Sequence, residues 1–444
     1  MNITLITFVT PSSENIRGTS ALPYHLIKGG RPTPSLPEGE GDIAHNFSIY
    51  TFNNNALSDE KIAEVRQELG AEIKPIPMPR WYQWMFRLHL LFLRIFMKYP
   101  FINYIKLPQK YVNEIKAKKP DLIWVMGEEL SRIVKQFPNQ RRIQIGPDTE
   151  SLYYYRMMGR RFVMNNVIDY WKCAMMYRKY ARMERDFCPD LDFTFYAVGE
   201  EDVRHLQQLN PKVQARFLRH PHYEVGNLSQ KTQKNAEIKM NTDDSDNKGH
   251  ADLADHAERI ANGCENIIKR FHSPKIKVLI AGQYNLYMKQ DADLLNEELR
   301  IKNEELVRHY TLTFLGKGWE KHVEAMRGAG YEVNHITFVP DYIEEICKHD
   351  IQITPISIGT GTKGKVLDAL ANGLLVIGTP YAMENIAVEN GVSCIEYRQP
   401  KEVIEVLMDI PDNREKYERM ADAGRQAVLT LHDRAKISKE IFNL

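Results

Sequence analysis

The sequence predicts an α/β protein built from two lobes, each with a parallel β-sheet. In residues 1–225, short apolar runs with strand character alternate with longer segments of helical periodicity. This alternation is typical of repeated βα units. Residues 226–273 are polar and predict a linker or insertion, since such a composition cannot form a packed core. The alternation resumes in residues 274–425, which predicts the second lobe.

The apolar runs give the expected order of the strands. In the first lobe we expect strands at 3–10, 46–52, 72–78, 121–126, 141–146, 192–198 and 215–221. In the second lobe we expect strands at 275–282, 311–318, 335–340, 351–357, 374–379 and 393–397. Residues 426–444 are amphipathic, and we expect them to form a helix that packs back toward the first lobe.

Composition narrows the class of protein. The chain has 444 residues, 43% of them hydrophobic, which is enough for two packed cores, and its net charge of +1 argues against a dedicated nucleic-acid binder. The five cysteines are scattered without zinc-binding spacing, which favours a reducing compartment. The first residues read as a strand instead of a signal peptide, and no apolar run reaches the roughly 18 residues that span a bilayer. We therefore expect a cytoplasmic protein.

Charge is unevenly distributed along the chain. Residues 1–225 contain 31 Lys and Arg against 24 Asp and Glu, a net charge of +7, and the remainder has a net charge of −6. A basic first half suggests an anionic partner or surface, although ordinary solvated charge is an alternative explanation.

Residues 80–101 combine basic and aromatic side chains. Arg80, Arg87 and Arg94 recur every seven residues, and Lys98 follows one helical turn later. One interpretation is an amphipathic helix that lies on an anionic membrane, giving a peripheral contact at the inner face. The other is a core helix of the first lobe with an exposed basic stripe.

The stretch "ISIGTGTKGKVLDALANG", residues 356–373, predicts a strand, a glycine turn and a helix. Gly359, Gly364 and Lys365 have the spacing of a phosphate-binding P-loop. An ATPase is disfavoured, because Val366 stands where a P-loop needs Ser or Thr for Mg²⁺. A glycine turn before a helix still offers N–H groups to an anion, so we expect a phosphate site of another kind. A purely structural turn is the alternative.

Several motifs then point to a family. "LIAGQYNLYMKQDADLL" has Gly282 and Lys289 at the positions of a family glycine and lysine, and "KVLDALANGLLVIGT" and "AMENIAVENGVSCIEY" follow in the family's order. With these motifs, residues 276–425 resemble the carboxy-terminal lobe of GT-B glycosyltransferases, in the broad retaining group called family 4. The first lobe matches more loosely, with Gly18 where the family carries a glycine pair.

The resemblance implies two Rossmann-like lobes whose parallel sheets face a cleft, with a nucleotide sugar bound between them. It implies that the turn after the strand at 351–357 holds the donor diphosphate. The residues expected to bind the nucleotide sugar are Gly18, Gly282, Lys289, Thr360, Gly361, Lys363, Lys365 and Asp368. Protein cations can neutralise the diphosphate, so neither a metal nor a cofactor is expected. "DLD" at 190–192 and "DAD" at 291–293 are interpreted as surface features.

The sequence also departs from the family pattern. Thr360 stands where the first glutamate of a family pair is expected, and Gln283 stands in place of an arginine. A family histidine after the strand at 121–126 is missing, and Glu128 lies just beyond that point. Glu128 and Asp148 are the candidate catalytic residues that orient the acceptor hydroxyl, although either could be a helix cap.

Together these features predict a metal-independent glycosyltransferase of the hexosyltransferase type. It would move a sugar, with retention, from a nucleotide-diphosphate donor to an unknown acceptor, such as a lipid-linked or cell-envelope glycan. The alternatives are a sugar-nucleotide epimerase of the same fold and a non-catalytic, degenerate transferase acting as a binding subunit. The expected partners are the nucleotide sugar and the acceptor, with no nucleic acid.

Overall fold

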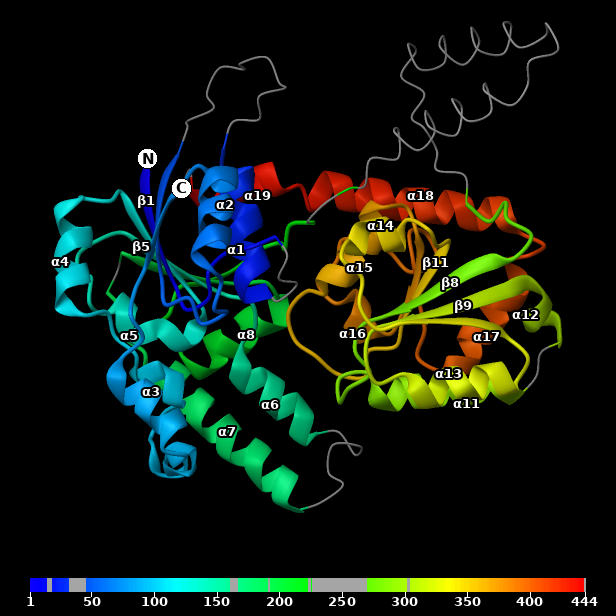
Figure 1. Cartoon of the computed structure of the whole chain (residues 1–444), viewed down its shortest axis with the longest axis horizontal. Helices are drawn as coiled ribbons and strands as arrows, with labels where there is room; N and C mark the ends of the chain where they lie inside the picture. The colour runs from blue at the N-terminus through cyan, green and yellow to red at the C-terminus, as the bar shows by residue number, and fades with distance from the viewer. Residues whose placement is uncertain are drawn as a thin grey trace, which may run out of the picture.

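The computed structural model describes residues 1–13, 18–31, 45–159, 167–190, 192–222, 225, 270–301 and 304–442. Within these residues the chain forms two α/β lobes that lie side by side (Figure 1). The predicted fold class is therefore confirmed. The predicted linker at 226–273 falls outside the described residues except for 270–273.

The amino-terminal lobe has a seven-stranded parallel sheet in the order β3-β2-β1-β4-β5-β6-β7. Its strands are β1 (Asn2–Thr7), β2 (Asn46–Thr51), β3 (Glu72–Pro75), β4 (Leu122–Met126), β5 (Arg142–Gly146), β6 (Phe193–Ala197) and β7 (Ala215–Phe217). Its helices are α1 (Gly18–Gly29), α2 (Asp59–Leu69), α3 (Arg80–Arg87), η1 (Leu90–Phe96), η2 (Phe101–Tyr104), α4 (Gln109–Ala117), η3 (Glu128–Leu130), α5 (Ser131–Val134), α6 (Glu150–Met158), α7 (Val167–Asp186) and α8 (Glu200–Leu209).

The carboxy-terminal lobe has a six-stranded parallel sheet in the order β10-β9-β8-β11-β12-β13. Its strands are β8 (Ile276–Ala281), β9 (Tyr310–Leu315), β10 (Glu332–Ile336), β11 (Ile351–Thr354), β12 (Leu375–Gly378) and β13 (Ile395–Glu396). Its helices are α11 (Lys289–Ile301), α12 (Glu304–His309), α13 (Glu320–Gly328), α14 (Tyr342–Ile346), α15 (Gly364–Ala371), α16 (Pro380–Met383), α17 (Pro400–Asp409) and α18 (Arg414–Leu431).

One strand is shifted from its predicted position. The sequence predicts a strand at 335–340, whereas β10 begins at Glu332 and ends at Ile336, paired along its length with β9. Phe338 is 78% exposed, whereas Ile336 and Val339 are partly buried against the core. An apolar run alone did not distinguish a buried strand from an exposed turn.

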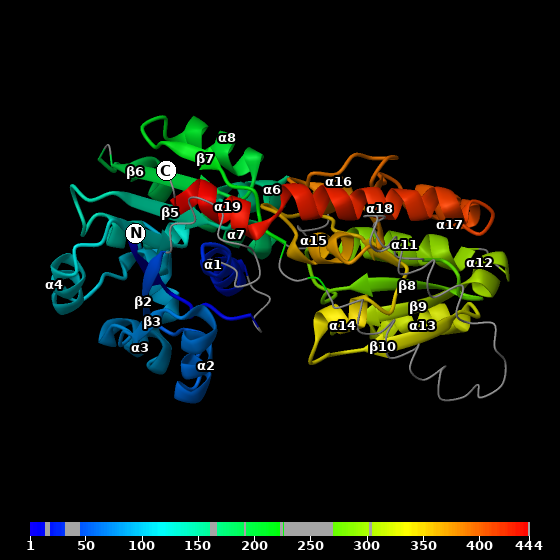
Figure 2. The ribbon, with the colours of Figure 1, turned by 90° about the horizontal axis from the view of Figure 1, so that it is seen from above.

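The end of the chain returns to the first lobe. Helix α18 runs along the carboxy-terminal lobe, and α19 (Arg434–Phe442) packs beside α1 of the other lobe (Figures 1 and 2). Ser438 Oγ donates to the Leu26 carbonyl at 2.7 Å. Phe442 is fully buried, with its ring 5.4 Å from Phe47 and 5.5 Å from Trp124. The last helix is thus part of the amino-terminal core.

Residues 80–101 do not form a core helix, so that interpretation of the sequence is wrong. The segment divides into α3, η1 and η2, and His89, between the first two, has a left-handed φ of 52°. Neither α3 nor η1 contains a buried residue. Most of their large apolar side chains are therefore exposed, although Tyr82 packs against the edge of the core.

Candidate active site

A cavity of about 820 Å³ lies between the two lobes. Its walls come from the segments that follow β5, β8 and β11, and from α6, α7 and α15. In the carboxy-terminal sheet, β8 and β11 are neighbours whose connections run in opposite directions along the sheet. Parallel α/β proteins bind ligands outside the carboxyl ends of strands at such a switch point. The fold therefore makes this cavity the candidate active site.

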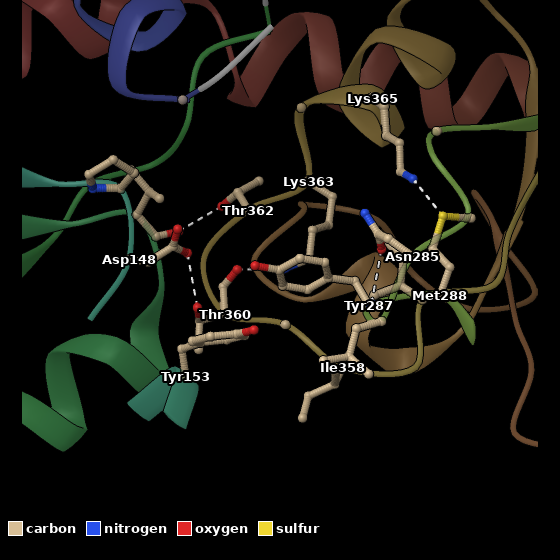
Figure 3. Close-up of a pocket in the computed structure, with 18 of the residues that line it drawn as sticks. Asp148, Tyr153, Asn285, Tyr287, Met288, Ile358, Thr360, Thr362, Lys363 and Lys365 are labelled. Carbon is tan, nitrogen blue, oxygen red and sulfur yellow. Dashed lines mark hydrogen bonds between the residues drawn. The ribbon is translucent and has the colours of Figure 1, made fainter. Parts of the chain in front are cut away.

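Two lysines bring positive charge to the carboxy-terminal side of the cavity. Lys365 Nζ donates to the Ala281 carbonyl at 2.9 Å and lies 3.5 Å from Met288 Sδ (Figure 3). Lys363 Nζ donates to the carbonyls of Thr360 at 2.6 Å and Gly361 at 2.9 Å. Within the described chain, neither ammonium is hydrogen-bonded to a carboxylate.

Burial weakens the protonation of both lysines. It lowers the pKa of Lys365 to about 8, with the nearby charge of Lys363 acting in the same direction. It also lowers the pKa of Lys363, although the carboxylate of Asp148 opposes that effect. A bound anion would relieve this cost, because it favours the charged form of each lysine.

The backbone around the lysines is shaped for close approach. Gly282, directly after β8, has φ of 117°, and a Cβ there would lie 2.6 Å from Lys365 Nζ. Lys363 and Gly364 begin α15, and the first N–H groups of a helix have no partner within it. The turn and the helix terminus thus both favour a negatively charged ligand.

Deeper in the same wall lie two groups that can bind hydroxyls. Asp368, one turn into α15, is 5% exposed and lines the cavity. Tyr342, at the start of α14, also lines it, and its buried hydroxyl has no hydrogen-bond partner among the described residues. A ligand hydroxyl would satisfy the Tyr342 hydroxyl, and Asp368 can accept from a second one.

The amino-terminal lobe supplies carboxyl groups to the opposite wall. Asp148, after β5, accepts from Thr360 Oγ1 at 3.1 Å, a hydrogen bond that joins the lobes (Figure 3). Glu150, at the start of α6, also lines the cavity. Burial raises the pKa of Asp148, and burial together with neighbouring carboxylates raises the pKa of Glu150 to about 8.

The glycine turn is held against the amino-terminal lobe by several contacts. Asp202 Oδ2 accepts from the Gly361 N–H at 3.2 Å, and Thr362 Oγ1 donates to the Val198 carbonyl at 2.6 Å. Arg156 adds a two-point ion pair with Glu384, with N–O distances of 2.7 and 2.9 Å. The position of the turn therefore depends on both lobes.

Aromatic side chains form another part of the wall. The rings of Tyr153, on α6, and Tyr287, before α11, lie 5.6 Å apart across the two lobes. Tyr154 also lines the cavity and stacks on Tyr180 of α7 at 5.7 Å. Aromatic faces of this kind can pack against sugar rings or apolar chains.

The structure brings together most of the residues that the sequence proposed. The predicted residues that line the cavity are Gly18, Asp148, Gly282, Thr360, Lys363, Lys365 and Asp368. Glu128, Lys289 and Gly361 are not among the lining residues.

Each of the three exceptions has a local cause. Lys289 Nζ is held by Asp293, one turn along α11, at 2.7 Å, and by the Tyr284 hydroxyl at 2.9 Å. Glu128 is 5% exposed, and its Oε1 accepts from the Glu150 N–H at 3.2 Å. Gly361 faces the other lobe, where a Cβ would lie 2.3 Å from Asp148 Oδ1.

Sequence reasoning missed several residues of the wall. The helix that begins at Glu150, soon after Asp148, also carries Tyr153 and Tyr154. Because this helix follows the end of a strand, its first residues could have been predicted to lie near the site. Tyr287 lies in the segment after β8, for which Gly282 was the signal, whereas Tyr342 carries no local signal, because it meets the site through the packing of α14.

The described part of the chain contains no group of three or more His, Cys, Asp or Glu side chains placed to hold a metal ion. None of the described helices combines the length and apolar character required to cross a bilayer.

Comparison with known proteins supports the assignment of the fold. Residues 275–413 match the model of the family described as glycosyl transferases group 1. A search of curated protein sequences finds no match. Among solved structures, HepE (Alr3699) of Anabaena in complex with UDP and glucose is 11% identical, with a TM-score of 0.56 over 100% of this chain and 98% of that chain.

Two further solved structures have a similar fold. WaaG, a glycosyltransferase involved in lipopolysaccharide biosynthesis, is 14% identical with a TM-score of 0.56 over 100% of both chains. Sucrose-phosphate synthase of Thermosynechococcus elongatus is 11% identical with a TM-score of 0.56, covering 100% of this chain and 97% of that chain. At such identities the likeness establishes the fold, which is GT-B.

Proposed function

We propose that the protein is a glycosyltransferase that moves a sugar from a nucleotide-diphosphate sugar to an acceptor hydroxyl. The observation that carries this proposal is the pair Lys363 and Lys365, half-buried at the cavity, whose ammonium groups contact carbonyls and a thioether among the described residues. This pair lies within residues 275–413, which match the group 1 model, and HepE, which has a similar fold, has been solved with UDP and with UDP-glucose. The epimerase and the non-catalytic subunit are not favoured by these comparisons.

In this proposal the carboxy-terminal lobe binds the donor. The diphosphate lies against the lysines and the start of α15, and Asp368 accepts hydrogen bonds from ribose hydroxyls. Lys363 supplies the positive charge that is missing at Gln283, where the family has an arginine. The lysines supply the positive charge that a divalent metal supplies elsewhere, so we expect turnover to persist in EDTA. Loss of turnover with chelator, restored by Mg²⁺ or Mn²⁺, would contradict this expectation.

The amino-terminal lobe would orient the acceptor. As the bond between the anomeric carbon and the diphosphate oxygen breaks, its electron pair stays on the diphosphate, where the lysines stabilise the added charge. The acceptor oxygen bonds to the anomeric carbon, and its proton passes to the departing diphosphate. Asp148 holds the acceptor hydroxyl in place for this step. We propose a hexosyl donor and retention of the anomeric configuration, in line with the family resemblance.

Calorimetric titration with UDP tests the donor site. Lys365→Ala removes a charge-assisted contact of about 1.5–3 kcal/mol, so UDP affinity is expected to fall about tenfold to a hundredfold. Lys289→Ala is the matched control, because that lysine is held by Asp293 outside the cavity wall and its loss is expected to leave affinity unchanged. Equal effects of the two substitutions would refute the assignment of the site.

A further inference from the structure

We propose that α3, η1 and the first turns of α7 form a docking surface for an anionic lipid bilayer. The docking itself does not depend on the proposed transferase activity. Both parts of this surface lie along the lower edge of the amino-terminal lobe in Figure 1.

The docking surface is rich in exposed apolar side chains. On α3 and η1 the exposed large apolar residues are Trp81, Trp84, Phe86, Leu88, Phe92, Leu93, Ile95 and Phe96. On the first turns of α7 they are Val167, Ile168, Tyr170 and Trp171. Phe96 is 82% exposed and Val167 is 83% exposed. Exposed apolar side chains in such number mark an interaction site.

The two parts of the surface are fastened together. Lys179, in the middle of α7, donates to the carbonyls of Arg94 at 2.8 Å and Ile95 at 3.2 Å, and also to that of Met97. A cavity of about 160 Å³ lies between the segments, with Arg94, Met176 and Tyr180 in its wall. The middle of α7 is therefore fixed to η1, and the helix holds its first turns in place relative to α3 and η1.

The charge of this surface selects the occupant. On α3 and η1 the charged residues are Arg80, Arg87 and Arg94, with no Asp or Glu. On the first turns of α7, Asp169 is paired with Lys172. Arg80, Arg87 and Arg94 are exposed, and none has a carboxylate within ion-pair distance in the described parts of the chain. Unpaired cations among exposed Trp and Phe fit the headgroup region of an anionic bilayer, where apolar rings enter the interface and arginines meet phosphates.

The same helices connect this surface to the active-site cavity. Tyr153, Tyr154 and Met157 of α6 and Cys173 of α7 line the cavity, and Cys173 lies two residues from the exposed Trp171. A docked bilayer would therefore lie beside the acceptor side of the cavity. If the proposed function holds, an acceptor anchored in the bilayer has a short route to the site.

Vesicle flotation at low salt tests the docking. The wild-type protein is expected to float with vesicles that contain phosphatidylglycerol, to stay unbound with pure phosphatidylcholine, and to be released by high salt. Arg87→Glu with Arg94→Glu is expected to lower the bound fraction at least about tenfold, because the charge reversal repels the anionic surface. Ile168→Glu with Trp171→Glu is expected to act similarly through the apolar part.

Two matched controls lie on the other lobe. Arg419→Glu reverses an exposed arginine of α18, and Phe338→Glu replaces a phenylalanine that is 78% exposed. Both are expected to leave flotation unchanged. Equal loss in the controls, or a wild-type protein that stays unbound at low salt, would overturn the proposal.

Size-exclusion chromatography without lipid tests whether a second copy of the chain, and not a bilayer, covers the docking surface. A dimer that both surface variants dissociate, with no wild-type flotation, would assign the surface to a second copy of the chain and overturn the bilayer proposal. Flotation requires no donor, so failure of the transferase assay would leave this result intact. Failure of flotation with normal UDP binding would refute the docking alone.

Discussion

The two lobes share a strand order around their first strand, yet one presents lysines and the other presents carboxyl groups to the cavity between them. The carboxy-terminal lobe contributes Lys363 and Lys365, whereas the amino-terminal lobe contributes Asp148 and Glu150. The residues behind the two walls differ as well, since Glu128 and Asp202 lie buried on the amino-terminal side. Each group shifts in pKa because burial disfavours its charged form.

This difference shows how one architecture can present two different sets of polar groups to a cavity. In both lobes the sheet core is apolar, and the polar residues stand on segments that follow the strands. Such segments can change without disturbing the core, so function is set by the loops and not by the sheet. The family model matches residues 275–413, which lie in the lobe that carries the lysines.

The largest expected effect is that the stability of the two lobes changes with pH in opposite directions. The pKa of Asp202 is raised to about 7 and that of Glu150 to about 8 from usual values of 3.8 and 4.5, so the folded amino-terminal lobe holds protons that the unfolded chain releases. Its stability is therefore expected to fall as pH rises from about 4 to about 8, by about 1.4 kcal/mol per pH unit for each extra proton.

Lys365 acts in the other direction. Its pKa is lowered from 10.5 to about 8, so the unfolded chain holds more protons and the carboxy-terminal lobe should gain stability as pH rises through that interval. Hydrogen exchange, followed separately in β5 and β11, would measure the stability of each lobe as a function of pH. Asp202→Asn should reduce the pH dependence in the amino-terminal lobe, and Lys365→Met should reduce it in the carboxy-terminal lobe. A change of stability with pH in the same direction in both lobes would contradict this prediction.

The next prediction tests whether the lobes have separate cores. Phe442→Ala should lower the free energy of unfolding of the amino-terminal lobe by about 3–5 kcal/mol, because it leaves a cavity beside Phe47 and Trp124. Leu431→Ala, at the exposed end of α18, is the control and should have little effect. Hydrogen exchange should show the loss in the amino-terminal lobe, and an equal loss in β11 and β12 would show that the lobes unfold as one unit.

A third prediction separates donor binding from acceptor activation. Asp148→Asn keeps an oxygen for Thr360 but removes the charge, so transfer is expected to fall about a hundredfold while UDP binds equally well or more tightly. Glu128→Gln is the comparison, because that buried residue does not line the cavity and its loss should leave transfer close to wild type. Steady-state kinetics and calorimetry measure the two quantities, and a matching loss of UDP affinity in Asp148→Asn would place Asp148 on the donor side.

The smallest effect concerns the turn after β8. Gly282→Ala introduces a Cβ that would lie 2.6 Å from Lys365 Nζ, in a backbone conformation that costs Ala about 1–3 kcal/mol. We expect UDP affinity to fall about tenfold, since the ammonium must move. Gly328→Ala, where a Cβ would meet nothing within 4 Å, should leave binding unchanged. Unaltered binding in Gly282→Ala would show that Lys365 can shift freely.

The strands were predictable because their signal is local. Buried parallel strands need short continuous apolar runs, and β4, β5 and β11 lie within the runs that predicted them. Lys363 and Lys365 were predictable for a related reason, since they flank a glycine turn between a strand and a helix. β10 was misplaced because Phe338 is apolar but exposed.

The partners of individual side chains were not predictable. Lys289 was expected at the donor, but Asp293 and Tyr284 hold it elsewhere. Glu128 was expected in the site, but Glu150 lines the cavity instead. Neighbours in sequence gave no means to choose between these carboxylates, because burial depends on how α6 packs.

The sequence by itself therefore determined two parallel α/β lobes and a glycine turn between a strand and a helix, since these depend on patterns within about 20 residues, the span of a single βα unit. Tertiary structure alone decided that Asp148 meets Thr360 across the lobes, that Tyr153 faces Tyr287, and that the apolar residues of α3 and η1 stay exposed. Each of these outcomes joins or separates segments far apart in the chain. Such contacts follow from the packing of whole elements, which local periodicity does not specify.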